Sequence, residues 1–173
     1  VGVDVTWEGG AADIDGQCLL VRGRMDRYQL KIPLLGRHQL ENAATAVAAL
    51  EVLREQGRKI PPDAISRGFA AVSWPCRMEV LYRSPLLVAD GAHNLYSMDN
   101  LLDSLRRYLS YRRLVVVVGF SRDKNVAEIV RRLAGAKPLV FATSSRHPRA
   151  LNPGVVAARF RALGTHAVET ATL

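Results

Sequence analysis

Residues 78–163 alternate apolar runs with amphipathic stretches, and this alternation constrains the fold more than any other feature of the sequence. Stretches with helical spacing are predicted at 96–109, 125–134 and 153–163, and apolar runs typical of strands at 78–83, 86–89, 114–118 and 138–142. The second and third of these runs are apolar throughout, which is typical of strands covered on both faces. Strands that alternate with helices in this way indicate an α/β fold with a parallel-rich, doubly wound sheet of the Rossmann type.

The first third of the chain has a different pattern. Short strands are predicted at 1–7, 18–22 and 28–32, with breaks at Gly9-Gly10 and at 13–16. A long helix then ends near Gln56, and a short helix starts at Pro61-Pro62-Asp63 and runs to about Val72. The stretch from Ser73 to Arg77 interrupts the pattern, so we predict one domain over residues 1–73 and a second over residues 74–173.

The long helix carries two apolar stripes at helical spacing. One stripe consists of Leu40, Ala43, Ala44 and Val47, and the other of Ala46, Ala49 and Leu53. A helix that is apolar on two sides is typical of a buried element, so we expect both stripes to be covered. Asn42 lies at the start of the second stripe, where its amide can offer a donor and an acceptor to a base edge or bond locally within the helix.

The composition of the 173 residues narrows the class of protein without deciding its function. Hydrophobic residues make up 49% of the chain, but no apolar run approaches the roughly 20 residues of a membrane helix. Cys18 and Cys76 fit no metal or redox spacing, which favours a reducing, cytoplasmic location. A formal charge of +8 favours anionic partners such as nucleic acid, nucleotide phosphates or polycarboxylates. The chain lacks an initiating Met and a secretory leader pattern, and residues 165–173 resemble an unfinished strand, so we expect a piece of a longer protein.

Polar clusters follow three of the predicted strands, at residues 90–94, 119–125 and 143–149. Ligands of open α/β sheets bind outside the carboxyl ends of the strands, so the clusters predict a site there, although loops of this kind are also polar simply because they are solvated. In the first cluster, Asp90 can face a pair of ligand hydroxyls and His93 can meet a phosphoryl oxygen, while the next helix would aim free N–H groups at an anion. The alternative is a helix cap beside a surface histidine. Arg77 can pair with phosphates or tether two domains.

Several of these stretches, in this order and spacing, resemble the folylpolyglutamate synthase/dihydrofolate synthase branch of the Mur ligase superfamily. The resemblance covers essentially the whole chain and is carried by residues 34–46, Trp74 to Val80, Asp90-Gly91-Ala92-His93-Asn94, Gly119 to Lys124 and Pro148-Arg149-Ala150. It implies that residues 1–73 are the strand–helix tail of the central ATPase domain and that the rest is most of a Rossmann-like C-terminal domain. Two positions depart from the family pattern, because Cys76 stands where glycine is usual and Leu95 where proline is usual.

The resemblance also implies an activity, namely ATP-dependent ligation of L-glutamate to folate or dihydropteroate through an acyl phosphate. It implies that Asn42 lies near the adenine, Asp90 at the ribose, and Arg77 and His93 at the phosphates. The sequence has no phosphate-loop motif, so the phosphate loop and the Mg²⁺ ligands would belong to an N-terminal ATPase half outside this chain, and the chain alone would be inactive. Lys124, Arg146 and Arg149 are candidates to hold glutamate carboxylates.

Two rival functions stay open at this point. Another Mur ligase, such as a muramyl-peptide ligase, would share much of the pattern. A basic nucleic-acid-binding module is suggested by Arg106-Arg107 and Arg112-Arg113. These arginines bracket an amphipathic helix without interleaved aromatic residues, so a solvated helix face is the favoured interpretation, and we expect neither nucleic acid nor membrane as a partner.

Overall fold

The computed structural model describes residues 2–122 and 125–170. Within it the chain forms two compact units. The first unit contains residues up to Gly91 together with Asp103–Leu109, and the second contains Ala92–Leu102 and residues from Ser110 onward. Helix α3, Leu95–Tyr108, is continuous and contributes to both units. The predicted domain boundary after residue 73 does not coincide with the boundary of these compact units, which are defined by contacts, and it stays a prediction.

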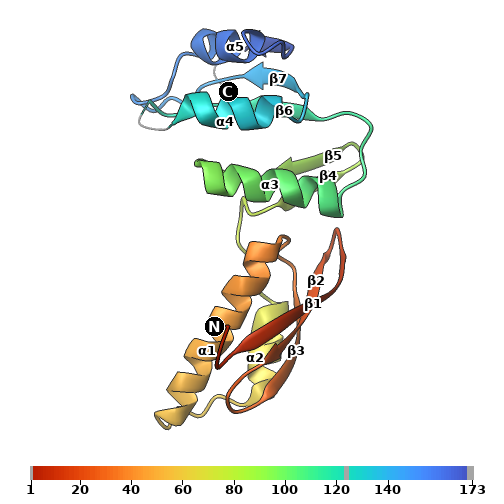
Figure 1. The fold of residues 1–173 in the computed structure, drawn as a ribbon, viewed down its shortest axis with the longest axis vertical. Helices are drawn as coiled ribbons and strands as arrows, with labels where there is room; N and C mark the ends of the chain where they lie inside the picture. Colours follow the sequence, from red (N-terminus) through yellow and green to blue (C-terminus); the bar gives the residue numbers. More distant parts are fainter. Residues whose placement is uncertain (1, 123–124, 171–173) are drawn as a thin grey trace. The chain divides into compact units, whose positions relative to one another are not determined.

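The first unit begins with an antiparallel sheet whose strands follow the chain order β1-β2-β3 (Figure 1). The strands are β1, Thr6–Asp13, β2, Gly16–Arg22, and β3, Arg27–Ile32. Buried and exposed residues alternate along β3, as expected for a sheet with one covered face. The predicted strands at 18–22 and 28–32 are therefore confirmed, and the turn predicted at 13–16 joins β1 to β2.

The first strand was predicted in the wrong place. It runs over Thr6–Asp13 rather than 1–7, and Gly9 and Gly10 lie inside it instead of breaking it. The pairing of β1 with β2 shifts register between Gly9 and Ala12, and a Cβ added at Gly9 would lie 3.0 Å from Cδ1 of Leu40. These glycines therefore mark an irregular strand and the close approach of a helix, which are the other common roles of glycine in a strand.

Helix α1, Arg37–Glu55, packs along this sheet, and α2, Pro62–Ala70, contacts β3 (Figure 1). Burial of the first predicted stripe on α1, from Leu40 to Val47, is confirmed. This stripe joins a hydrophobic core that includes Leu19, Val21, Tyr28, Leu30, Ile32, Leu40, Ala43, Ala44, Val47 and Ile65. The second stripe was predicted wrongly, because Ala46, Ala49 and Leu53 are exposed. Alanine is the best helix former and has little apolar area, so it stabilises a helix without needing cover.

Two further strands, β4, Glu79–Arg83, and β5, Leu86–Ala89, form an antiparallel pair in the first unit. The second unit has a parallel sheet in the order β6-β7-β8, made of Val115–Val118, Leu139–Ala142 and Ala167–Glu169. Helix α4, Val126–Ala134, packs against α5, Pro153–Arg161, which contacts β7 and β8. The strand and helix predictions for residues 78–163 are thus confirmed to within one or two residues, and so is the α/β class with a parallel sheet.

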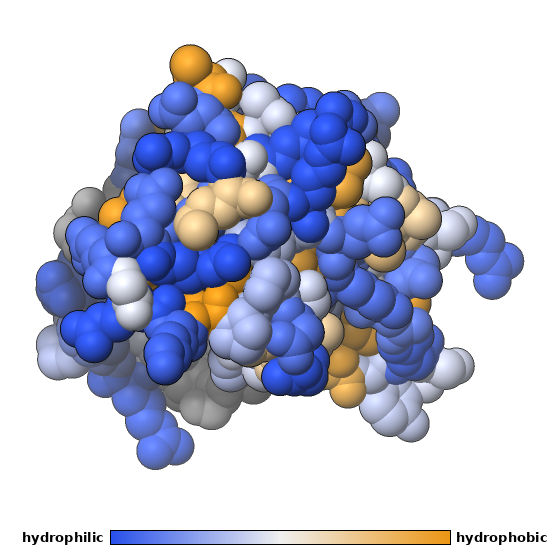
Figure 2. Space-filling model, turned by 90° about the horizontal axis from the view of Figure 1, so that it is seen from below, coloured by the Kyte–Doolittle hydropathy of each residue, from blue (hydrophilic) through white to orange (hydrophobic). Residues whose placement is uncertain are grey.

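The expectation that two of these strands are covered on both faces is wrong for the structure described. Leu87 in β5 is 53% exposed and Val117 in β6 is 61% exposed. These two side chains lie on strand faces that the described elements leave largely uncovered. On the face that Figure 2 shows, hydrophilic residues dominate and hydrophobic residues form small separate patches. Among the described residues, no helix is both long enough and apolar enough to cross a bilayer.

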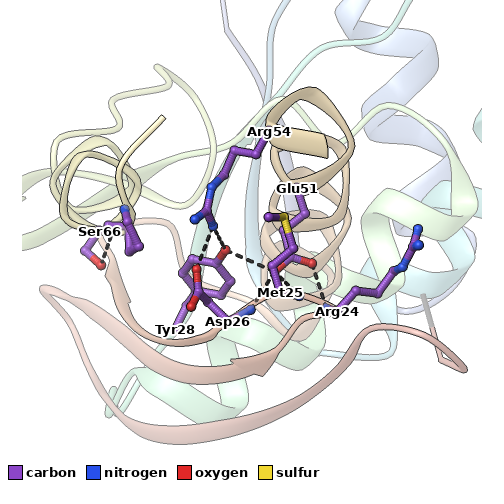
Figure 3. A network of polar contacts seen from close by, with 8 residues as sticks. Arg24, Met25, Asp26, Tyr28, Glu51, Arg54 and Ser66 are labelled. Atoms are coloured by element: carbon purple, nitrogen blue, oxygen red, sulfur yellow. Dashed lines mark hydrogen bonds and ion pairs between the residues drawn. The ribbon is translucent and has the colours of Figure 1, made fainter. Parts of the chain in front are cut away.

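A buried carboxylate fastens α1 to the turn between β2 and β3. Glu51 is only 1% exposed, and its two oxygens accept hydrogen bonds from the backbone N–H groups of Arg24, Met25 and Asp26 and from the Tyr28 hydroxyl, at 2.7–3.1 Å (Figure 3). A Cβ at Gly23 would lie 2.2 Å from Oε1 of Glu51, so only glycine leaves room for the carboxylate. The polar side chain therefore completes the backbone hydrogen bonding of a tight turn.

The charges around Glu51 follow from this arrangement. Burial opposes ionisation, but the N–H groups of Arg24, Asp26 and Met25 and the Tyr28 hydroxyl outweigh it and lower the pKa of Glu51. Burial and the Glu51 carboxylate together raise the pKa of Tyr28 to about 12. Arg54 closes the network, since its Nη1 donates to Asp26 Oδ2 at 2.7 Å and to the Tyr28 hydroxyl at 2.9 Å.

Replacement of Glu51 by alanine is expected to lower the free energy of unfolding by about 3 kcal/mol, because several buried donors lose their acceptor. Glu55→Ala on the same helix is the control. Glu55 is exposed and only pairs with Arg24 at 3.3 Å, so its loss should cost less than about 0.5 kcal/mol. Urea unfolding of the protein that carries this chain measures both values.

The pKa shift of Glu51 predicts how its contribution to the free energy of unfolding changes with pH. The folded-state pKa of Glu51 lies below its unfolded value, so its contribution is complete above about pH 5 and is lost as the pH falls through the folded pKa. The difference in the free energy of unfolding between wild type and Glu51→Ala should therefore shrink as the pH falls below about 5. A difference that is the same at pH 7 and pH 3 would contradict the role given to the carboxylate.

Candidate functional site

The segment before β4 and the residues that follow β5 are joined by two hydrogen bonds, one between backbone groups and one from the backbone to a side chain. The N–H of Gly91 donates to the carbonyl of Cys76, and the N–H of Met78 donates to Oδ2 of Asp90, both at 2.9 Å. The residues on either side of Arg77 have left-handed backbones, with φ of 56° at Cys76 and 49° at Met78. This unusual conformation turns the chain sharply at Arg77 and holds it beside the strand end that carries Asp90.

Arg77 and Gly91 fit closely together. A Cβ added at Gly91 would lie 2.8 Å from Nη1 of Arg77, and the same Nη1 donates to the Cys76 carbonyl at 3.2 Å. Glycine at position 91 therefore leaves the room that the guanidinium occupies. Two of the predicted site residues, Arg77 and Asp90, are thus held on adjacent segments.

The departure at position 76 has a structural meaning. Its positive φ is the conformation that favours glycine, and a non-glycine residue there costs about 1 kcal/mol. Cys76 adopts it nevertheless, and its N–H donates to Oε2 of Glu79 at 2.9 Å. The bend at Arg77 is therefore present with a Cβ at position 76.

The first turns of α1 carry a series of hydrogen-bonded polar side chains, of which the sequence analysis singled out Asn42 but neither Gln39 nor His38. Nδ2 of Asn42 donates to Oε1 of Gln39 at 3.2 Å, and Nε2 of Gln39 lies 3.1 Å from Nε2 of His38. Gln39 is 8% exposed, His38 is half-buried and Asn42 is exposed. The local hydrogen bond considered for Asn42 is therefore present, and its amide still reaches the surface. The i, i+3 spacing of Gln39 and Asn42 was the available signal.

His38 also links α1 electrostatically to the predicted site. Burial is the largest effect and lowers the pKa of His38. Asp90 and Glu41 act in the opposite direction, and Arg77 adds to the lowering. The first unit therefore brings Arg77 and Asp90 into electrostatic range of the histidine that begins the chain to Asn42.

A buried glutamine holds the loop that leads into α1. Nε2 of Gln17 donates to the carbonyls of Leu34 and Gly36 at 2.7 and 2.9 Å, and its Oε1 accepts from the Tyr108 hydroxyl at 3.1 Å. Gly36 has a φ of 113°, and a Cβ there would lie 2.6 Å from the His38 ring. The start of α1 is thus positioned by β2 and by the last turn of α3.

His93 belongs to the second unit, where it lies just before α3. Its N–H and that of Asn94 donate to Oγ of Ser97 at 3.0 and 3.1 Å, while the Ser97 N–H donates to Oδ1 of Asn94 at 2.8 Å. Asn94 is therefore a helix cap, as the alternative reading of this cluster proposed. The backbone N–H groups of His93, Asn94 and Ser97 each have a nearby hydrogen-bond partner, so the expectation that such groups are free is wrong for these three. The side chain of His93 is exposed.

The second and third polar clusters meet in the second unit, as the parallel pairing of β6 and β7 requires. The Arg122 N–H donates to the Arg149 carbonyl at 2.9 Å, and a Cβ at Gly119 would lie 2.8 Å from the Thr143 carbonyl oxygen. The N–H of Arg149 donates to Nδ1 of His147 at 3.2 Å. Lys124, which was grouped with Arg146 and Arg149, lies outside the described residues.

A separate open groove of about 620 Å³ lies beside α1 and is lined by Gly2, Thr6, Trp7, Arg37, Glu41 and Thr45. The guanidinium of Arg37 stacks over the Trp7 ring at 5.5 Å. None of the four predicted site residues lines this groove. Within residues 2–122 and 125–170, no group of three or more His, Cys, Asp or Glu side chains could hold a metal ion.

Comparison with known proteins identifies the family. The family described as "Mur ligase, glutamate ligase domain" matches residues 76–173, which is more than half of the chain. The chain belongs to the Mur ligase family. The matched region begins at Cys76 and Arg77, and it includes Asp90 and His93.

Relatives in the folate branch of the family cover more of the chain. A dihydrofolate synthase/folylpolyglutamate synthase of Mycobacterium tuberculosis is 34% identical over 80% of this chain, and a folylpolyglutamate synthase of Lacticaseibacillus casei is 35% identical over 65% of it. A solved structure of the M. tuberculosis folylpolyglutamate synthase complexed with ADP has a TM-score of 0.85, 31% identity and 96% coverage of this chain. The chain spans 29% and 26% of the two curated relatives and 38% of that structure.

Gly91→Ala is expected to displace the Arg77 guanidinium with little loss of stability, because the clash is with the mobile end of a side chain. If Arg77 binds phosphate, nucleotide affinity should fall by about tenfold, the effect of one lost charge-assisted hydrogen bond. Gly68→Ala is the matched control, since a Cβ at Gly68 meets no atom within 4 Å. Calorimetric titration with ATP measures both variants, and equal affinities would contradict the pairing of Gly91 with Arg77.

Proposed function

We propose that this chain is part of an ATP-dependent ligase that joins L-glutamate to folate or dihydropteroate. In this reaction ATP phosphorylates a carboxylate of the pterin substrate, the glutamate amine attacks the acyl phosphate, and an amide forms as phosphate leaves. The observation that carries the proposal is the pairing of Arg77 with the Asp90-Gly91 strand end, which presents a cation and a carboxylate side by side. The folate-branch relatives, whose names include this substrate class, support it.

In the proposed site, Asn42 reads the adenine, Asp90 binds the ribose hydroxyls, and Arg77 and His93 bind the phosphates. The residues fit such a ligand chemically. A guanidinium pairs with phosphate oxygens in a planar fork, and an amide offers one donor and one acceptor to a base. The solved M. tuberculosis relative with ADP supports nucleotide binding in this family. Charge on the transferred phosphoryl group needs cations and hydrogen-bond donors nearby. We propose that Arg77 supplies a cation and that the His93 ring donates a hydrogen bond.

The rest of the ATP site belongs, in this proposal, to an N-terminal ATPase half. The phosphate loop and the ligands of Mg²⁺ would come from that half, and Mg²⁺ would neutralise charge on the ATP phosphates. Residues 1–73 would end the ATPase domain and residues 74–173 would form the C-terminal domain, so that Arg77 and His93 reach the phosphates when the domains close. The start of the family match at Cys76 is compatible with this boundary. The free thiols of Cys18 and Cys76 support a cytoplasmic location.

The rival functions make different predictions in the same assay. A muramyl-peptide ligase would consume ATP with a muramyl acceptor rather than with a pterin. A nucleic-acid-binding module would bind DNA in a salt-dependent manner and consume no ATP. Arg106 and Arg107 lie in the last turn of α3, where cations complement the helix dipole, so these residues have a structural role without nucleic acid.

The full-length protein is expected to form ADP over many turnovers only when a pterin acceptor and L-glutamate are both present. Asp90→Asn should lower kcat/KM for ATP by about tenfold or more, because it removes the charge at the proposed ribose site. The Asn oxygen would accept from the Met78 N–H, so its NH₂ would replace the other carboxylate oxygen as an acceptor for the ribose. Asp63→Asn is the control, since Asp63 pairs with Arg67 on the surface of α2. Coupled ADP release measures each rate. The 173-residue chain alone should show no turnover, and turnover by it would contradict the proposed division of the site.

The basic residues of the third cluster suggest where glutamate binds. Arg149 and Arg146 follow β7, and we propose that they hold the carboxylates of glutamate. Arg149→Glu in the full-length enzyme should raise the KM for glutamate by about tenfold or more, since it replaces an attraction by a repulsion. Arg159→Glu on α5 is the control. An unchanged KM for glutamate in Arg149→Glu would contradict this assignment.

A further inference from the structure

The three side chains at the start of α1 form a hydrogen-bonded chain with one direction. Oε1 of Gln39 accepts from Nδ2 of Asn42, so the other end of the Gln39 amide, Nε2, faces Nε2 of His38 at 3.1 Å. An amide nitrogen can only donate. Nε2 of His38 must therefore accept, which requires a neutral imidazole with its proton on Nδ1.

The environment of His38 maintains that neutral form. Burial lowers its pKa, and the charged groups that act on it are Asp90 at the end of β5, Arg77 before β4 and Glu41 on α1. The two carboxylates favour the imidazolium and the guanidinium opposes it, but burial dominates. At neutral pH the chain of hydrogen bonds therefore keeps its direction.

The direction of these hydrogen bonds decides which atoms Asn42 offers to a ligand. One proton of Nδ2 is engaged by Gln39, so Asn42 presents Oδ1 as an acceptor together with its remaining N–H. An acceptor at this position matches the 6-amino group of adenine and opposes the 6-oxo group of guanine. A rotated amide would present the opposite pattern and match the 6-oxo base.

We propose that His38 and Gln39 are positioning residues that fix the amide orientation of Asn42 and thereby select a 6-aminopurine nucleotide over a 6-oxopurine nucleotide. The inference rests on the proposed function in one respect, namely that Asn42 faces the base. It adds two residues to the site and a reason for their chemistry. Gln39 is 8% exposed, which is low enough for its orientation to be set by its two partners rather than by water.

Protonation of His38 reverses the direction of the hydrogen bonds that link His38, Gln39 and Asn42. An imidazolium donates from Nε2, so Gln39 must turn its Oε1 toward the histidine and its Nε2 toward Asn42, whose amide then rotates. Because burial lowers the pKa of His38, selectivity for the 6-amino base should be constant at and above neutral pH and should decrease only below about pH 6.5.

Two substitutions at position 39 separate orientation from packing. Gln39→Met keeps the bulk of the side chain and removes both hydrogen bonds. Gln39→Glu keeps an acceptor for Asn42 and presents a second acceptor to His38, which can then donate whether it is neutral or charged. Gln56→Met at the far end of the same helix is the control, because Gln56 is exposed.

The experiment measures the dissociation constants of AMPPCP and GMPPCP with the full-length protein between pH 5.5 and 8. We expect Gln39→Met to reduce the preference for AMPPCP by about tenfold at neutral pH, as loss of one oriented hydrogen bond does. Gln39→Glu should retain the preference and lose its decrease at acid pH, and Gln56→Met should match wild type. A Gln39→Met protein with the wild-type preference, or a Gln39→Glu protein as impaired as Gln39→Met, would overturn the inference.

This titration, together with the ADP-release assay of glutamate ligation, separates this inference from the proposed ligase function. A wild-type protein that prefers AMPPCP, responds to Gln39→Met as expected and does not ligate glutamate would contradict the ligase but support the positioning role. A wild-type protein that ligates glutamate while Gln39→Met keeps its preference would contradict the positioning role alone. A protein that binds neither nucleotide would contradict both.

Discussion

The carboxylate of Glu51 is the interaction on which the position of α1, and with it the proposed site, depends. It satisfies three backbone N–H groups of the turn at residues 24–26 and so fixes α1 against β2 and β3. A buried charge is tolerated here because its donors are backbone groups that would otherwise lack partners. Since α1 is one rigid helix, the fastening near its C-terminal end also determines where its first turns lie. Those turns carry Asn42 and its neighbours.

The opposite end of α1 is fixed by a second polar contact, and the two together position the helix that carries Asn42. Gln17 holds the loop at Leu34 and Gly36 and connects it to Tyr108. Arg77 is held independently, by the left-handed backbone around it and by the space that Gly91 leaves. The amide of Asn42 is thus placed by a helix, and the guanidinium of Arg77 by a turn whose backbone is held by hydrogen bonds. Both would suit the preorganised site that we propose.

The sequence predicted the fold where the pattern was local and strong. The strand at 28–32 and the stripe from Leu40 to Val47 were predicted correctly, because burial of large or regularly spaced apolar residues dominates those elements. The second stripe, with Ala46 and Ala49, was wrong because alanine is compatible with either burial or exposure. The start of β1 was wrong because a glycine pair can serve in a turn or in an irregular strand, and only the contact with Leu40 distinguishes them. Asp90 and Arg77 were selected from motifs, whereas the roles of Gln17, Gln39 and His38 depend on contacts that no single motif encodes.

The most direct test of this account is a structure of the full-length protein with a non-hydrolysable ATP analogue. The account predicts Oδ1 of Asn42 within about 2.7–3.2 Å of the adenine amino group, the Asp90 carboxylate on the ribose hydroxyls and the Arg77 guanidinium on the phosphates. It also predicts that Gln39 still bridges His38 and Asn42. A bound nucleotide that contacts none of Asn42, Arg77 and Asp90 would contradict the assignment of the site.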